Sequence, residues 1–252
     1  MKKKIIIIAI SAAIAIAAGL FYPFVLQPRL EVYNAIQGTI PDIGEPAKYF
    51  TEYSVTNDNT FTVDNGHISA EIPVGFQKDE ERDYTDFWRR GEYEDVIITE
   101  SDEQKDMNFL ATECYAEKDT EIGVDGFKKA FEAFGNGIPD SAFNTYKVMY
   151  MLENEDYNFW DLNIAKTYLA VGYSKCVNMV FHQNYYIYER DNICAIIGVT
   201  DNETKNPPGK VKYSVQAEVY TTDNLNICTI MLINTNSLEE AYGIINSVKA
   251  VN

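Results

Sequence analysis

The feature that most constrains this chain is an uncharged run at its N-terminus. No charged residue occurs from Ile5 to Leu26, and the lysines Lys2–Lys4 precede the run. A helix of about twenty residues rises about 30 Å, which matches the hydrocarbon core of a bilayer. Lysines before a span favour a cytoplasmic N-terminus and export of the remainder of the chain. The sequence therefore predicts a basic cytoplasmic end over residues 1–4 and a transmembrane signal anchor over residues 5–26.

A cleaved signal peptide is the alternative interpretation of this run. Ala13-Ile14-Ala15 and Ala15-Ile16-Ala17 both fit the A-x-A pattern of a cleavage site. Cleavage there would leave a strongly apolar mature end, AGLFYPFVL, and a diffusible acidic binding protein. The unbroken length of the run favours the anchor. A lipid-modified end is excluded, because the first cysteine is Cys114 and none directly follows the apolar run.

The end of the run and the segment after it indicate a membrane interface followed by a spacer. Phe21, Tyr22 and Phe24 lie near the outer end, where aromatic rings form a belt at the lipid–water boundary. Residues 27–58 contain three of the eight prolines and are predicted to be a spacer. Residues 59–252 have the size of one ordinary domain, and no Pro/Ser/Gly-rich linker divides them.

The charge balance restricts the partners of the exported part. Removing the three N-terminal lysines leaves 18 basic residues against 38 acidic ones, a formal charge of −20. Such a surface repels phosphate backbones and anionic headgroups, so we expect no nucleic acid partner. Solubility is the simplest role for this charge. Composition rich in Ile, Asn, Lys and Tyr, with one N-x-[ST] site at Asn202, favours a bacterial origin.

The clearest local signal is the hairpin FTVDNGHISAEIP. Asn65-Gly66 is typical of a two-residue turn. That turn would pair Val63 with Ile68 and Phe61 with Ala70, and these side chains would share one face with Ile72. A third strand is predicted over Asp95–Ser101.

The middle of the chain has helical spacing, and the last third returns to a period of two. Helices are predicted in DEQKDMNFLATECYAE, GFKKAFEAFG, PDSAFNTYKVMYMLENE and WDLNIAKTYLAVGYSKCVNMVF, which form a helical insertion over about residues 104–182. Two hairpins come next, turning near Arg190–Asn192 and near Asp223-Asn224. Ser237 and Glu240 form a capping-box pattern before the apolar stripe of a terminal helix.

These elements predict an α+β domain. The segments ICAIIGV and ICTIMLI are apolar on both faces, which is typical of strands covered on both sides. We therefore expect a largely antiparallel sheet with helices on both faces, an α/β/α sandwich. The pieces EIPVGF, the last two hairpins and EEAYGIINSV resemble the PsbP/Mog1-like fold over roughly residues 59–104 and 183–250. The resemblance implies a non-catalytic domain that binds protein partners, and it carries no site residues with it.

No motif predicts a catalytic, metal or cofactor site. The two histidines, His67 and His182, are far apart and match no zinc spacing. Phosphate-cradling loops, a nucleophile elbow and the S-x-x-K signature are all absent from the sequence. Paired acids could serve glycoside hydrolysis, but 38 acidic residues supply such pairs by chance. We therefore predict no cofactor and no metal, and keep a carboxylate-dependent envelope hydrolase as the alternative.

Cysteines and aromatic residues supply the remaining candidates. Cys194 and Cys228 lie on two strands predicted to be neighbours, so a disulfide between them is possible, although buried thiols fit equally well. The aromatic residues fit best as part of the core, because aromatic rings supply much of the buried area. If a binding patch exists, Trp88, Arg89, Arg90 and Trp160 are its candidate residues, because Trp and Arg dominate binding hot spots. The sequence thus favours a membrane-anchored exported module that binds an envelope protein or carbohydrate. An accessory factor that only positions other membrane proteins is a further alternative.

Overall fold

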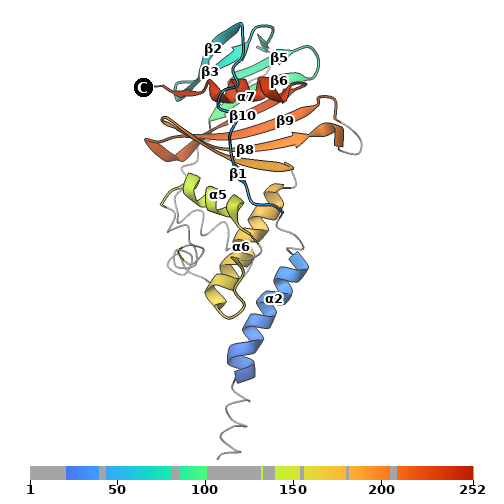
Figure 1. Ribbon diagram of the computed structural model, residues 1–252, viewed down its shortest axis with the longest axis vertical. Coiled ribbons are helices and arrows are strands. Elements are labelled where there is room, and N and C mark those ends of the chain that lie inside the picture. The colour runs from blue at the N-terminus through green and yellow to red at the C-terminus, as the bar shows by residue number, and fades with distance from the viewer. Residues whose placement is uncertain are drawn as a thin grey trace, which may run out of the picture.

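An eight-stranded sheet organises the part of the chain that the computed structural model describes (Figure 1). The described residues are 21–39, 44–80, 86–100, 132, 140–153, 156–179, 182–204 and 209–251. The fold is α+β, as predicted. Residues 1–20, the two predicted helices DEQKDMNFLATECYAE and GFKKAFEAFG, and Cys114 lie outside the described residues, except for Glu132.

Seven of the eight strands run in an antiparallel arrangement. In spatial order the eight are β1 (Lys48–Tyr49), β7 (Asn184–Arg190), β8 (Ile193–Asp201), β9 (Tyr213–Thr221), β10 (Asn224–Thr235), β6 (Glu94–Glu100), β5 (Asp86–Arg90) and β4 (Gln77–Lys78). The edge strand β1 pairs with β7 in parallel, and every other pair is antiparallel. The two C-terminal hairpins turn close to the predicted positions.

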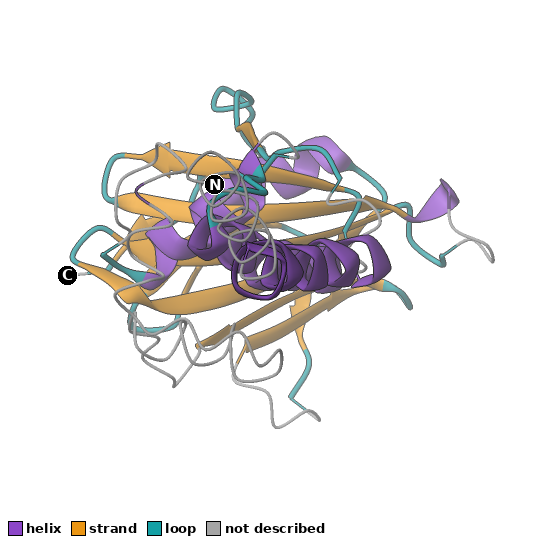
Figure 2. Ribbon diagram, turned by 90° about the horizontal axis from the view of Figure 1, so that it is seen from below, coloured by secondary structure: helices purple, strands orange, loops and turns teal. Residues whose placement is uncertain are grey.

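The sheet separates two layers, each with its own core. Helices α5 (Ala142–Met151) and α6 (Leu162–Met179) cover one face, as Figure 2 shows from the helical side. Helix α7 (Leu238–Asn246) covers the other face, together with a small sheet of β11 (Lys249–Ala250), β3 (Ile68–Pro73) and β2 (Thr60–Asp64). The small sheet is separate from the large one, which the sequence did not indicate.

Strand β8 shows why its sequence is apolar on both faces. Ile197 packs into the core on the α7 side, and its neighbour Ile196 packs into the core on the α5 side. Both side chains are buried. Alternate residues of a strand point to opposite faces, so a strand inside two layers needs apolar residues at every position.

The predicted hairpin has the right face but the wrong register. Val63 pairs with Ala70 and Phe61 with Ile72, two residues away from the predicted partners. The turn uses Gly66 and His67 instead of Asn65 and Gly66. Gly66 has a φ of +90°, which suits glycine at the first central position of the turn. A shift of two residues leaves every side chain on its face, so the core residues are those predicted.

The terminal helix α7 begins as its sequence predicts, but its capping box is only half formed. The Ser237 hydroxyl accepts a hydrogen bond from the Glu240 N–H at 3.2 Å. The Glu240 carboxylate does not return to Ser237. Instead, the Thr235 hydroxyl accepts from the Ser237 N–H, and Glu240 binds Arg90. The helix therefore starts at a tertiary contact.

The segment predicted to be a spacer is largely structured and packed on the domain. A π-helical turn η1 (Tyr22–Leu26) leads into helix α2 (Gln27–Thr39). Val32 and Ile36 of α2 are buried in the core on the α5 side. Phe50 is 2% exposed and joins the core on the α7 side. The domain thus recruits residues well before position 59.

Among the described residues, no helix is both long enough and apolar enough to cross a bilayer.

Candidate functional site

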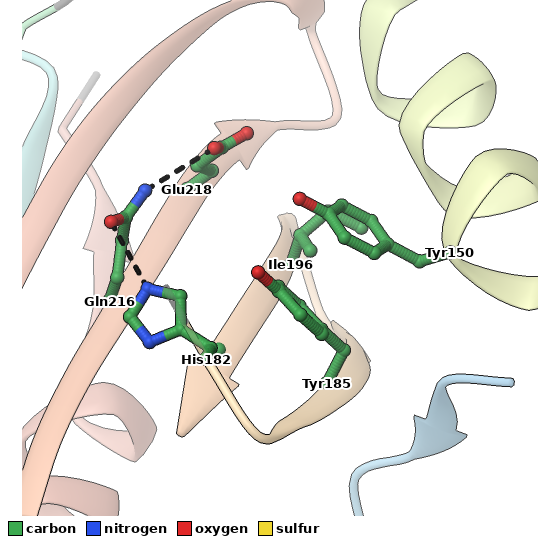
Figure 3. A pocket seen from close by; sticks show the side chains of 7 residues that line it. Tyr150, His182, Tyr185, Ile196, Gln216 and Glu218 are labelled. Atoms are coloured by element: carbon green, nitrogen blue, oxygen red, sulfur yellow. Dashed lines mark hydrogen bonds between the residues drawn. The ribbon is translucent and has the colours of Figure 1, made fainter. Parts of the chain in front are cut away.

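A small hollow opens on the face of the large sheet that carries α5 and α6. Its walls come from the last turn of α5, the start of β7 and the middle of β8 and β9 (Figure 3). The lining residues are Tyr150, His182, Tyr185, Ile196, Gly198, Gln216 and Glu218. Segments separated by more than sixty positions are therefore brought together by the sheet.

The polar wall of the hollow results from the alternation of β9. Val215, Ala217 and Val219 are buried in the core on the α7 side. Gln216 and Glu218 must then point to the opposite face, where the hollow lies. The Gln216 side chain donates to the Glu218 carboxylate at 3.5 Å. A strand covered on both sides would normally be apolar at these positions, so the polar pair marks the site.

His182 lies against a glycine of β8. Its Nδ1 is 3.1 Å from the Thr200 hydroxyl, and its Nε2 is 3.3 Å from the Gln216 side-chain oxygen. A Cβ atom at Gly198 would come within 2.5 Å of the His182 ring. Gly198 therefore makes the space that the imidazole occupies. The sequence placed His182 between a helix and a strand but could not show this contact.

Two tyrosines form the opposite wall. The rings of Tyr150 and Tyr185 stack with centroids 4.2 Å apart and planes at 22°. Burial raises the pKa of Tyr185 to about 12. Burial also raises the pKa of Tyr150, whose hydroxyl hydrogen-bonds to Tyr185. Both phenols stay protonated at neutral pH, so neither is a base there.

The size and charge of the hollow limit its chemistry. Its volume is about 30 Å³, room for about two water molecules. Glu218 is the only residue with a carboxylate among the described residues that line the hollow. No group of three or more His, Cys, Asp or Glu side chains that could hold a metal occurs in the described ranges. The hollow therefore has room only for water or a small polar group.

The predicted binding residues Trp88, Arg89 and Arg90 lie on β5, and Arg90 is held there by short ion pairs. Arg90 makes bidentate contacts to Glu94, at 3.0 and 3.1 Å, and to Glu240, at 2.7 and 2.8 Å. Its guanidinium also lies 4.4 Å from the centroid of the Phe76 ring. These contacts use the whole guanidinium of Arg90 within the fold, so Arg90 is a structural residue.

Trp88 is half-buried between two sheets. Its ring packs 4.9 Å from the ring of Phe61 on β2. The indole Nε1 is buried and has no hydrogen-bond partner among the described residues. Arg89 has a side chain that is 38% exposed and sits 3.7 Å from Asp79. Trp88 and Arg89 are consecutive in β5, so their side chains point to opposite faces of the strand and each remains a separate candidate.

Trp160 lies elsewhere in the molecule. It precedes α6, is 64% exposed, and contacts α2 through Arg29. Figure 1 shows β5 and the lower parts of α2 and α6 at opposite ends. The structure therefore does not bring Trp160 together with Trp88 and Arg89.

The two cysteine candidates form no disulfide with each other in the structure. The prediction that they lie on neighbouring strands is wrong, because β9 runs between β8 and β10. Two strand spacings amount to about 9.5 Å, beyond the reach of a disulfide. Cys228 is buried, and burial raises the pKa of the half-buried Cys194 thiol. Both therefore behave as small apolar side chains.

The comparisons with protein-family models and with curated proteins give no match.

Proposed function

We propose that this chain is a single-pass membrane protein whose exported α+β domain binds another protein or an envelope ligand without catalysis. One observation carries the proposal. The uncharged run 5–26 ends in η1, which leads directly into α2, and α2 packs into the core on the α5 side through Val32 and Ile36. A helix joins the run to the domain, so an anchor would fix the position of the domain.

A binding role fits the described surface better than the hydrolase alternative. A carboxylate-dependent hydrolase needs two acids that face a cleft. Glu94 and Glu240 do converge from separate elements, but Arg90 lies between them and binds both. The hollow contributes one carboxylate and has room for about two waters. The resemblance to the PsbP/Mog1-like fold also supports a protein partner, as a proposal at the level of fold.

Membrane fractionation with intact mass measurement tests the anchor. We expect full-length protein in the membrane pellet of a bacterial host, with the domain removed by protease added outside. A soluble product that lacks the first fifteen to seventeen residues would replace the anchor with a cleaved signal. The chain would then be a diffusible acidic binder, and the role of positioning other membrane proteins would be excluded.

Crosslinking in intact membranes tests Arg89 as a binding residue. Arg89→Ala should change the set of crosslinked partners, because Arg89 is a cation on β5 whose side chain is 38% exposed. Lys48→Ala is the matched control, since Lys48 is an exposed cation on the opposite edge strand. An identical crosslink pattern for wild type, Arg89→Ala and Lys48→Ala would remove Arg89 from the proposed binding residues.

A further inference from the structure

An arginine ties a remote tryptophan to the start of α2. Arg29 donates from Nε and from one terminal nitrogen to the carbonyl oxygen of Trp160, at 3.1 and 2.9 Å. Its other terminal nitrogen donates to the Val25 carbonyl at 2.6 Å. One side chain thus joins the last residues of the uncharged run to a loop 131 positions later in the sequence.

The loop that carries Trp160 is held in place by its own contacts. The Asn158 side chain accepts from the N–H groups of Trp160 and Asp161. Asp161 accepts from the N–H groups of Asn163 and Ile164 at the start of α6. The ring of Phe159 meets that of Tyr33 on α2 edge to face, with centroids 6.3 Å apart. Trp160 therefore has a defined place beside α2.

The three most exposed aromatic rings of the described residues lie at this same end. Phe24 is 73% exposed, Trp160 64% and Tyr22 56%. Large exposed side chains are commonly placed where a surface meets an apolar partner. Trp and Tyr are the residues that favour the boundary between lipid tails and water, because each has an apolar ring and a polar group.

Trp160 lies beside Arg29 of α2, and this level along α2 matches the boundary between lipid tails and water. Arg29 lies three residues after Leu26, about 4.5 Å further along a helix. The headgroup zone outside the hydrocarbon core is about 5–7 Å thick on each side. If the span ends near Leu26, the level of Arg29 and Trp160 falls inside this zone.

We infer that Trp160, positioned by Arg29, inserts into the outer headgroup zone of the bilayer that the anchor crosses. The inference rests on the proposed anchor and adds a second contact with the membrane, from a segment distant in sequence. A single span leaves a domain free to tilt, whereas two contacts hold the domain in one orientation. The contact depends on aromatic rings, because a domain with a formal charge of −20 gains little from anionic headgroups.

Tryptophan fluorescence tests the inference, because the chain has only two tryptophans. Full-length Trp88→Phe protein, which retains Trp160, is reconstituted into phosphatidylcholine vesicles with lipids spin-labelled either near the headgroup or at the acyl-chain end. We expect strong loss of Trp160 emission with the shallow label and weak loss with the deep one. Trp160→Phe protein, which retains Trp88, is the matched control and should lose no emission with either label.

Removing the arginine separates positioning from anchoring. Trp88→Phe/Arg29→Ala protein should still float with the vesicles but lose the quenching of Trp160. The inference would be overturned if the protein floats with the vesicles but its Trp160 emission is quenched by soluble acrylamide and not by the lipid labels. The anchor would then stand. Protein that does not float with the vesicles would overturn the anchor itself, and the inference with it.

Discussion

Arg90 on β5 and Glu240 on α7 form a two-pronged ion pair, with nitrogen–oxygen distances of 2.7 and 2.8 Å. Glu94 binds the same guanidinium from the other side. The Thr235 hydroxyl donates to Glu240, and the Asn236 N–H donates to Glu94. These contacts join the edge of the large sheet to the first turn of α7.

Loss of Arg90 should destabilise the domain. Arg90→Met removes both charge-assisted pairs and leaves two carboxylates facing each other. We expect the free energy of unfolding to fall by about 2 kcal/mol, since the pairs are partly exposed and screened. Urea unfolding of the full chain in detergent measures the change. Arg89→Met is the control and should cost less than about 0.5 kcal/mol. Equal losses in the two variants would contradict the structural role of Arg90.

The same cluster should weaken in acid. Burial alone would raise the pKa of Glu94, but hydrogen bonds from Arg90 and the Asn236 N–H lower it below the ordinary value of 4.5. A lowered folded-state pKa stabilises the fold above the unfolded value, and this stability is lost as pH falls through the folded value. Glu94→Gln should therefore be less stable than wild type at neutral pH, and the two should converge below pH 4.5.

Unfolding midpoints measured from neutral pH downward give this comparison. Glu239→Gln is the control, because Glu239 is an exposed carboxylate on α7, next to the Glu240 of the cluster. A constant offset between wild type and Glu94→Gln at all pH values would show that proton binding at Glu94 is not linked to folding.

The sequence predicted faces and element types well, because these depend on local periodicity. The apolar face of the β2–β3 hairpin is correct even though its register is shifted, since a shift of two residues preserves the face. The cap of α7 is also local, and Ser237 accepts the predicted bond. Strands β1, β4 and β11 have two residues each, too few for any alternation to show.

The sites could not be predicted in the same way, because they depend on tertiary contacts. Gly198 looks like an interruption in an apolar strand until His182 is seen against it. Arg90 stands out in sequence as a cation on an acidic surface, which suggests an exposed binding residue. Its partner Glu240 lies 150 positions away, so its structural role is invisible before folding. The strand order is also tertiary: β9 lies between β8 and β10 and so excludes a disulfide between Cys194 and Cys228.

The tyrosine pair at the hollow should make the fold sensitive to alkali. Burial raises the pKa of Tyr185 from 10.0 to about 12. A raised folded-state pKa stabilises the fold below the unfolded value, and this stability is lost as pH rises from 10 to 12. Tyr185→Phe cannot ionise, so its stability should fall less over this range than that of wild type. Unfolding midpoints against pH measure the difference.

A matched variant keeps this prediction specific. Tyr49→Phe is the control, because Tyr49 is an exposed tyrosine on β1. It should track the wild-type curve over the same alkaline range. A Tyr185→Phe curve that also tracks wild type would show that ionisation of this phenol does not contribute to alkaline unfolding.

Substitution of Gly198 should displace His182 and disrupt the hollow. The new Cβ of Gly198→Ala would lie 2.5 Å from the imidazole ring, so the ring must move and lose its contacts with Thr200 and Gln216. Overpacking of this kind costs about 1–3 kcal/mol. The double variant Gly198→Ala/His182→Ala removes the clash, so it should be more stable than the sum of the two separate losses predicts. A double-mutant cycle by urea unfolding measures this coupling, and purely additive losses would show that the glycine does not serve to accommodate the histidine.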